Sequence, residues 1–241
     1  MEPQLTSLRR REHVAEGTTA FHFDKPRGFT FKAGQTIDLT LISPSETDSE
    51  GDTRTFSIAS PPDEPEIVIA TRIRSSAFKR VLSAVPLGTS VRMSEATGSF
   101  TLHKNTAKPA VFLAGGIGIT PFRSMSLDAT TRKTGHRISL FYSNHRPEDA
   151  PFLDELRQLE ERSHSTFHFV PTMTAMERSA REWRGETGYI GPDMLTRHLE
   201  DLHGPIYYIA GPPGMVSAFR QRLIAAGVDE DDIRAEEFAG Y

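Results

Sequence analysis

A glycine-rich stretch near the middle of the chain constrains the fold more than any other feature. It joins an apolar run at residues 111–114 to three glycines and a Thr-Pro pair: Gly115, Gly116, Gly118, Thr120 and Pro121. Glycines let the backbone turn sharply and let a ligand approach the main chain, and a helix start leaves N–H groups that favour an anion. The stretch therefore predicts a strand, a nucleotide-phosphate turn and a helix. A tight junction whose glycines serve only packing would show the same pattern.

Composition limits the chemistry that the chain can carry. With 241 residues it can hold one large domain or two modest ones, and its net charge of -4 gives no general attraction to nucleic acid. The sequence contains no cysteine, so no disulfide, thiolate nucleophile or cysteine-held metal cluster can form in it. Any electrons that it moves must therefore travel on an organic cofactor.

Nothing in the sequence indicates export or insertion into a membrane. Residues 1–14 are charged and lack the apolar core of a signal peptide, and no apolar run reaches membrane-spanning length. We therefore expect a cytoplasmic protein. His164 and His168 have the helical spacing of metal ligands, but the alternating residues around them favour a strand, so no metal site is predicted.

The first half of the chain has the pattern of β structure. Short alternating runs recur, each bounded by Gly, Pro, Asp or Ser, at residues 19–23, 36–41, 54–59, 66–71 and 90–93. This spacing favours an antiparallel barrel or sandwich, interrupted by one helix at 77–84. Residues 43–53 are acidic and polar, and we expect a long loop there.

Beyond Pro109 the pattern changes to alternating strands and helices. The expected strands are 110–114, 137–142, 166–171, 205–210 and 234–238, and the expected helices are 121–131, 151–161, 192–202 and 213–226. Such alternation predicts a doubly wound α/β unit with a parallel sheet, helices on both faces, and ligands at the carboxyl ends of the strands. The polar stretch 103–108 marks the boundary, so the predicted domains are residues 1–104 and 105–241.

Several motifs, in order along nearly the whole chain, resemble the ferredoxin–NADP reductase superfamily. Phe-Lys-Ala-Gly-Gln at 31–35 and Arg-Thr-Phe-Ser at 54–57 are similar to its flavin motifs Phe-x-x-Gly-Gln and Arg-x-Tyr-Ser. Residues 115–122 resemble its pyridine-nucleotide loop, and Ala-Gly-Pro-Pro-Gly-Met at 210–215 resembles its second nucleotide loop. The ending Glu-Glu-Phe-Ala-Gly-Tyr resembles the family's carboxylate-plus-aromatic terminus. The chain resembles the compact bacterial form without a fused iron–sulfur domain.

The resemblance implies an antiparallel β-barrel domain that binds FAD, with FMN as the alternative. Arg54 would bind the flavin phosphates, Phe56 would stack on the isoalloxazine, and Ser57 would hydrogen-bond near flavin N5. The family usually has Tyr in place of Phe56, so one hydroxyl contact to the ribityl chain is lost. The strand and the helix start that line the flavin would add Thr55, Ile69, Ala70, Thr71, Ser75, Ser76 and Ala77. Ser75 or Ser76 could also cap that helix.

For the second domain, the resemblance implies contacts to NADP or NAD. Thr120 would lie close to the nicotinamide, and a terminal aromatic, Phe238 or Tyr241, would cover the flavin face with Glu236 beside it. The predicted catalytic residues are therefore Ser57, Thr120, Glu236 and Phe238. The rest of the dinucleotide would contact Gly115, Gly116, Gly118, Pro121, Gly211, Pro212, Pro213 and Met215.

The preference between NADPH and NADH would be set after the second strand of the α/β domain. No carboxylate follows that strand until Glu148. Ser143, Asn144 and Arg146 could together hold a 2′-phosphate there, which favours NADPH. Alternatively, Arg146 pairs with Glu148 or Asp149, and the site is indifferent or favours NADH through Asn144.

The resemblance implies hydride transfer from NAD(P)H to FAD, followed by electron transfer to a separate iron–sulfur or flavin protein such as ferredoxin or flavodoxin. One alternative is a flavin reductase, ferric reductase or diaphorase that reduces small molecules. Another is a non-enzymatic flavin- or nucleotide-binding regulatory subunit. The sequence leaves the acceptor and the oligomeric state open.

Overall fold

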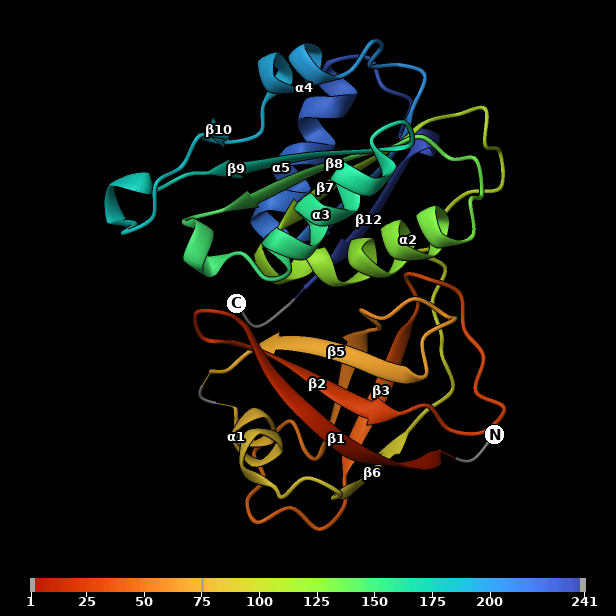
Figure 1. Ribbon diagram of the computed structural model, residues 1–241, viewed down its shortest axis with the longest axis vertical. Helices are drawn as coiled ribbons and strands as arrows, with labels where there is room; N and C mark the ends of the chain where they lie inside the picture. The colour runs from red at the N-terminus through yellow and green to blue at the C-terminus, as the bar shows by residue number, and fades with distance from the viewer. Residues whose placement is uncertain (1–2, 75, 239–241) are drawn as a thin grey trace.

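The computed structural model describes residues 3–74 and 76–238. Its strands form two six-stranded sheets, one antiparallel and one parallel, in the lower and upper parts of Figure 1. The predicted fold class is confirmed. Ser75 and Tyr241 lie outside the described residues, so their predicted contacts stay predictions. Within the described ranges, no helix is long and apolar enough to cross a membrane.

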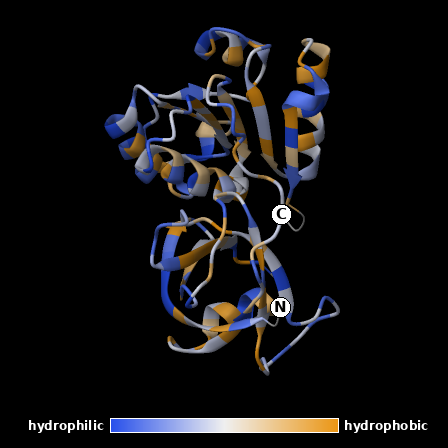
Figure 2. Ribbon diagram, turned by 90° about the vertical axis from the view of Figure 1, so that its right-hand side faces the viewer, coloured by the Kyte–Doolittle hydropathy of each residue, from blue (hydrophilic) through white to orange (hydrophobic). Residues whose placement is uncertain are grey.

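The antiparallel sheet is built from the first six strands, in the order β4-β3-β6-β1-β2-β5. Its elements are β1 Gln4–Ala15, β2 Thr18–Asp24, β3 Thr36–Leu41, β4 Thr53–Ser57, β5 Glu66–Arg72 and β6 Ser90–Met93, with helix α1 Ala77–Ala84 after β5. The edge strands β4 and β5 also contact each other, so the sheet curls into the expected barrel. Polar and apolar residues alternate along these strands (Figure 2), and the apolar residues of β3 enter the barrel core.

The parallel sheet has the order β10-β9-β8-β7-β11-β12. Its strands are β7 Ala110–Gly115, β8 Ile138–Asn144, β9 Phe167–Met173, β10 Glu186–Thr187, β11 Ile206–Gly211 and β12 Ile233–Glu237. The chain starts at β7, adds β8 to β10 outward on one side, and returns to place β11 on the other side of β7. The strand order therefore reverses between β7 and β11, and ligands of such sheets bind at this switch point.

Four helices cover the two faces of the parallel sheet: α2 Ile119–Thr131, α3 Leu153–Ser163, α4 Pro192–His198 and α5 Pro213–Ala225. Successive side chains of β7 point to opposite faces, so Phe112 packs with α2 and α3, whereas Val111 and Leu113 pack with α4 and α5. The helix expected at 192–202 ends at His198 because Leu199 takes an extended conformation. Strand β10 was not predicted, since its two residues are too few to show an alternating pattern.

Helix α2 joins the two parts of the molecule. Its Arg123 donates a hydrogen bond of 2.7 Å to the Ala59 carbonyl of the barrel, and Ser124 Oγ donates one of 2.7 Å to the Ser60 carbonyl. Arg123 also forms an ion pair of 2.6 Å with Glu155 on α3. The predicted domain boundary, between residues 104 and 105, falls in the connection from β6 to β7, and it stays a prediction.

Candidate functional site

A cavity of about 730 Å³ opens between the barrel and the carboxyl end of the parallel sheet. Ile117, Thr120 and Phe238 line it from the α/β side. From the barrel side it is lined by predicted flavin residues: Arg54, Thr55, Phe56, Ser57, Ala70, Thr71 and Ser76. The structure therefore brings most of the residues predicted to contact flavin together. Ile69 is an exception, because the alternation along β5 turns its side chain into the barrel core.

One end of this cavity is cationic. Arg54, Arg74 and Lys79 lie close together there, and Asp48 and Glu50 lie beside Arg54. Burial, with Arg74 and Arg54 nearby, lowers the pKa of Lys79 below its ordinary value. Such crowding of positive charge disfavours further protonation and favours a bound anion, so this end suits the phosphates of a nucleotide.

Helix α1 begins beside the cationic end, and its first turn is capped in a way that the sequence did not predict. Ser76 occupies the N-cap position but makes no side-chain hydrogen bond to the helix. The Ala77 N–H instead donates a hydrogen bond of 2.9 Å to Asp48 Oδ2 of the loop at 43–53. The capping group therefore comes from a distant segment of the chain.

A serine and a glutamate meet beside the same cavity. Burial raises the pKa of Glu236 to about 7, and the Ser57 hydroxyl partly offsets that rise. Among the described residues, neither Ser57 Oγ nor Glu236 Oε2 has a hydrogen-bond partner of normal geometry. Buried polar atoms are costly when unpaired, and Ser57 lines the cavity, so its Oγ fits a site that binds a polar ligand; Glu236 is not among the lining residues.

The other two predicted catalytic residues approach the cavity from the α/β side. Thr120 is 2% exposed, and its hydroxyl donates a hydrogen bond of 3.1 Å to the Ile117 carbonyl, which stabilises the turn. Phe238 is partly buried and is held by a hydrogen bond of 3.0 Å from its N–H to the Gly211 carbonyl. Phe238 is thus the aromatic residue of the described C-terminal segment that faces the cavity.

A second cavity, of about 440 Å³, lies at the switch point between β7 and β11. It is lined by five predicted nucleotide residues: Gly115, Gly116, Asn144, Pro212 and Met215. Both polar atoms of the Asn144 side chain are buried without a hydrogen-bond partner among the described residues. Arg72 lines this cavity as well as the first, so the two cavities adjoin.

The remaining loop residues shape the turns and do not line either cavity. A Cβ atom on Gly118 would lie 2.3 Å from the Ala210 carbonyl oxygen, so only glycine lets the turn at Gly116–Gly118 pack on β11. Pro121 is buried in the first turn of α2, and Pro213 is the exposed first residue of α5. Gly211 takes φ +158 where β11 ends.

Arg146 is held away from the second cavity by two carboxylates. Its Nη2 lies 2.8 Å from Asp149 and 2.7 Å from Glu16, which belongs to the hairpin of β1 and β2. The pairing with Asp149 is the alternative that the sequence left open. The ion pair with Glu16 also connects Arg146, in the α/β part, to the barrel. This arrangement does not support a 2′-phosphate site at Arg146.

Sequence reasoning missed several residues at the second cavity, among them His145, Tyr189 and Arg222. Arg222 shares a face of α5 with Met215 and Phe219, at helical spacing after the second nucleotide loop, and that spacing was a usable signal. The basic residues at the cavity are Arg72, His145 and Arg222, and its described lining contains no carboxylate. The second cavity therefore suits an anionic ligand.

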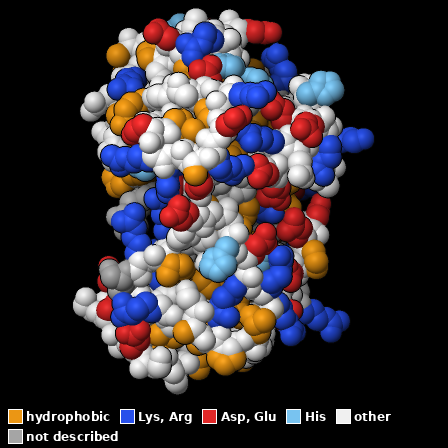
Figure 3. Space-filling view, turned by 60° about the vertical axis from the view of Figure 1, so that its left-hand side comes forward, with side chains coloured by type: hydrophobic (Ala, Val, Ile, Leu, Met, Phe, Trp, Pro, Cys, Tyr) orange, Lys and Arg blue, Asp and Glu red, His pale blue; other side chains and the backbone are white. Residues whose placement is uncertain are grey.

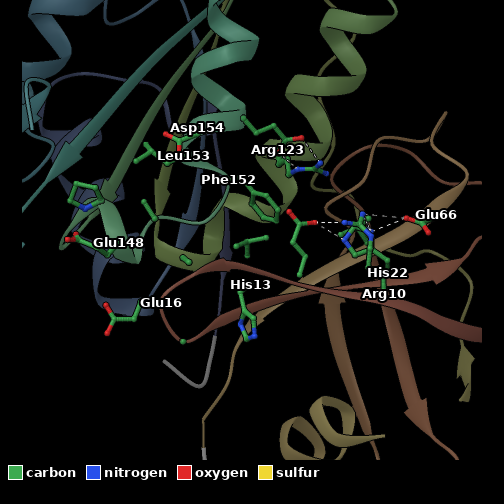
Figure 4. A pocket seen from close by; sticks show the side chains of 18 of the residues that line it. Arg10, His13, Glu16, His22, Glu66, Arg123, Glu148, Phe152, Leu153 and Asp154 are labelled. Atoms are coloured by element: carbon green, nitrogen blue, oxygen red, sulfur yellow. Dashed lines mark hydrogen bonds and ion pairs between the residues drawn. The ribbon is translucent and has the colours of Figure 1, made fainter. Parts of the chain in front are cut away.

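A third cavity, of about 900 Å³, lies between the β1–β2 hairpin and the start of α3 (Figure 4). It holds none of the predicted site residues. Arg10 is paired with Glu12 and Arg123 with Glu155, but the lining as a whole contains more carboxylates than arginines, so this cavity does not suit an anionic nucleotide. Figure 3 shows acidic and basic side chains side by side at the level where the two parts meet.

Among the described residues, no group of three or more His, Asp or Glu could hold a metal ion.

Comparisons with known proteins agree with this arrangement. Residues 112–221 match the family model of the oxidoreductase NAD-binding domain. Ferredoxin–NADP reductase B of Sorangium cellulosum is 30% identical over 202 residues, which cover 81% of this chain and 80% of that protein. The reductase component DmpP of phenol 2-monooxygenase from Pseudomonas sp. is 29% identical, over 90% of this chain and 60% of its own length.

Solved structures show the same fold. A ferredoxin NADP+ reductase from Neisseria gonorrhoeae with bound FAD and NADP has a TM-score of 0.82 and 22% identity, over 98% of this chain and 99% of that one. The FAD/NAD binding domain of nitric oxide dioxygenase from Vibrio cholerae has a TM-score of 0.84 and 18% identity, over 99% of both chains.

A curled antiparallel barrel, a parallel sheet with a glycine turn and two adjoining cavities give this chain the two-domain architecture of the reductases that it matches. The chain belongs to the ferredoxin–NADP reductase superfamily, as its motifs predict. It spans 60% of the length of the phenol 2-monooxygenase reductase component that it matches, and 57% of the length of the propane 2-monooxygenase one.

Proposed function

We propose that this protein takes hydride from NAD(P)H onto a bound FAD and passes electrons to a separate acceptor protein. The observation that carries this proposal is the pair of adjoining cavities, which share Arg72. One of them gathers the flavin-motif residues, and the other lies at the switch point of the parallel sheet. A donor bound in one can therefore reach an acceptor bound in the other.

The residues of the first cavity fit a flavin nucleotide. Its volume of about 730 Å³ lies in the range of cofactor sites, its cationic end suits phosphates, and the buried Ser57 Oγ beside Glu236 suits a polar ring edge. A bound flavin supplies the hydride acceptor and releases electrons one at a time, while the protein supplies position and electrostatics. Arg54 would hold the phosphates, Phe56 would lie against the ring, and Phe238 would cover its nicotinamide side.

The acceptor is proposed from the relatives. Two of them are named as reductase components of phenol 2-monooxygenase and propane 2-monooxygenase, and their names imply further components that receive electrons. We propose an iron–sulfur or flavin protein as the partner here, and a cytoplasmic location remains part of this proposal.

Anaerobic titration with NADPH tests the function directly. The purified protein should be yellow and should bleach on addition of NADPH. Ferredoxin, flavodoxin, a quinone and a ferric chelate are then added in parallel, and the colour should return fastest with a protein acceptor. Fastest return with a small molecule would favour a diaphorase or ferric reductase, and a colourless or unbleached protein would favour a regulatory subunit.

Glu236 is expected to make flavin reduction depend on pH. Its carboxyl is protonated below a pKa of about 7 and charged above it. A negative charge beside Ser57 opposes hydride arrival, so the stopped-flow reduction rate should fall roughly tenfold as pH rises through neutrality. In Glu236→Gln the rate should stay high and flat, because the amide keeps the shape without the charge.

The neighbouring Glu237, which is exposed, provides the matched control: Glu237→Gln should keep the wild-type pH profile. The folded-state pKa of Glu236 lies above the ordinary 4.5, so ionisation also costs the fold stability as pH rises toward 7. Glu236→Gln should escape that loss in thermal unfolding. A pH step that persists unchanged in Glu236→Gln would assign it to another group.

NADPH is expected to be the preferred nucleotide, with Arg222 as the residue that recognises its 2′-phosphate. The second cavity offers Arg222 and no described carboxylate, whereas Arg146 is occupied by Asp149 and Glu16. Because charged hydrogen bonds contribute about 1.5–3 kcal/mol, Arg222→Ala should lower kcat/KM for NADPH about ten- to hundredfold and leave that for NADH nearly unchanged.

Arg146→Ala is the matched comparison. It removes an arginine from the same region, and the ratio of kcat/KM for NADPH and NADH should keep its wild-type value. If Arg146→Ala changes that ratio and Arg222→Ala does not, the prediction made from the sequence holds and the assignment to Arg222 is wrong.

A further inference from the structure

The loop at residues 43–53 lies beside the cationic end of the first cavity, where Asp48 and Glu50 line the cavity together with Arg54. Asp48 Oδ1 accepts a hydrogen bond of 2.8 Å from Arg54 Nη2, and its Oδ2 accepts one of 2.9 Å from the Ala77 N–H. Glu50 lies 3.0 Å from the same Arg54 nitrogen. One carboxylate thus bridges the guanidinium of the flavin motif and the first turn of helix α1.

This bridge has the geometry of a bound phosphate. A phosphate group binds to a forked guanidinium and to backbone N–H groups at a helix N-terminus, through two or more oxygens. Of the two Asp48 oxygens, one accepts a hydrogen bond from the Arg54 guanidinium and the other accepts one from the Ala77 backbone N–H of helix α1. Burial opposes ionisation of this carboxyl, but hydrogen bonds from Ala77 and Arg54 hold its pKa below the ordinary value, so Asp48 is an anion at neutral pH.

The rest of the loop is fastened to the same two elements. Glu46 forms an ion pair of 2.6 Å with Arg80 on α1, and Arg54 Nη1 donates hydrogen bonds to the carbonyls of Glu50 and Gly51, at 3.0 and 2.8 Å. The Arg54 side chain is only 15% exposed as a result. A ligand that bonds to Arg54 must therefore displace some of these contacts.

We propose that Asp48 is a built-in competitor of the flavin phosphate, and that the loop at 43–53 is a clasp that opens when the flavin binds. The proposal rests on the proposed flavin function. A donor hydrogen that Asp48 already accepts is not available to a phosphate oxygen at the same time, so the two anions exclude each other. Lys79 and Arg74 line the same end of the cavity and are placed to receive the incoming phosphate first.

The competition lowers the apparent affinity for every flavin that carries phosphate. A binding-competent state populated only about one-tenth of the time raises the apparent Kd about tenfold. Asp48→Asn removes the anion and should restore the intrinsic affinity. Riboflavin, which has no phosphate, does not compete with Asp48, so its binding should not change.

The test is a set of flavin titrations on the full chain after its flavin has been removed. Kd is measured from flavin fluorescence for FAD, FMN and riboflavin. For Asp48→Asn, the Kd of FAD and of FMN should fall about tenfold and that of riboflavin should match the wild type. Asp52→Asn is the control, because it removes the same charge from the same loop without removing a contact to Arg54 or Ala77.

A second measurement needs no variant. Hydrogen exchange of the wild-type backbone at residues 43–53 should become faster when FAD is added, because the clasp opens. Slower or unchanged exchange there, an unchanged or higher Kd of FAD for Asp48→Asn, or an equal gain for riboflavin would overturn the proposal. Binding of no flavin by either wild type or variant would instead overturn the proposed flavin function itself.

Discussion

Arg54→Ala is expected to cost the protein most of its flavin. The Arg54 guanidinium lies at the cationic end of the first cavity, beside the start of helix α1. A charge-assisted hydrogen bond contributes about 1.5–3 kcal/mol, so its loss should weaken FAD binding about ten- to hundredfold. The measurement is the ratio of flavin to protein absorbance after purification, followed by an FAD titration.

Arg80→Ala provides the matched control for this experiment. Arg80 pairs with Glu46 of the same loop, so its loss loosens the loop without removing a donor that the flavin would use. Arg80→Ala should keep its flavin. Full flavin retention in Arg54→Ala, or equal loss in both variants, would show that Arg54 does not hold the phosphates.

Gly118→Ala is expected to destabilise the α/β part severely. A Cβ atom at this position would lie 2.3 Å from the Ala210 carbonyl oxygen and 2.7 Å from the Gly211 nitrogen, and both are backbone atoms that no side-chain rotation can move. The turn would have to separate from β11, at a cost of about 3 kcal/mol or more in the free energy of unfolding. Urea unfolding followed by far-UV circular dichroism measures this loss.

Gly214→Ala is the control, because Gly214 lies in the second nucleotide loop and a Cβ there would meet nothing within 4 Å. Its free energy of unfolding should stay within about 0.5 kcal/mol of the wild type. A Gly118→Ala protein as stable as Gly214→Ala would mean that the two loops separate at little cost.

The sequence predicted most elements of this fold because its signals are local, but the 12-residue strand β1 was not among the predicted strands. Turn residues and alternating patterns placed β3 and β6 at their observed bounds, since a strand with one buried face shows that face every second residue. Family motifs placed Arg54 and Ser57 at one cavity, because residues of one short motif lie on the same strand and therefore close together in space. The two-residue strand β10 had no local pattern to detect.

The contacts that could not be predicted are those between distant segments. The pairing of Arg146 with Glu16 joins residues 130 positions apart, and the bridge from Asp48 to Ala77 joins residues 29 apart. No periodicity encodes such pairs, because they depend on how the elements pack. Arg222 is the intermediate case, since helical spacing from Met215 places it on the correct face once the nucleotide loop is located.

The position of helix α2 has a consequence for the reaction geometry. Its first turn carries the nucleotide loop, and one turn later Arg123 and Ser124 are hydrogen-bonded to the barrel. A single helix of 13 residues therefore links the glycine turn of the α/β part to the barrel. Because a hydrogen-bonded helix resists stretching, this helix would set the spacing between nicotinamide and flavin in the proposed reaction. In the same proposal, the nicotinamide would have to displace the Phe238 ring, which follows β12 and lines the first cavity.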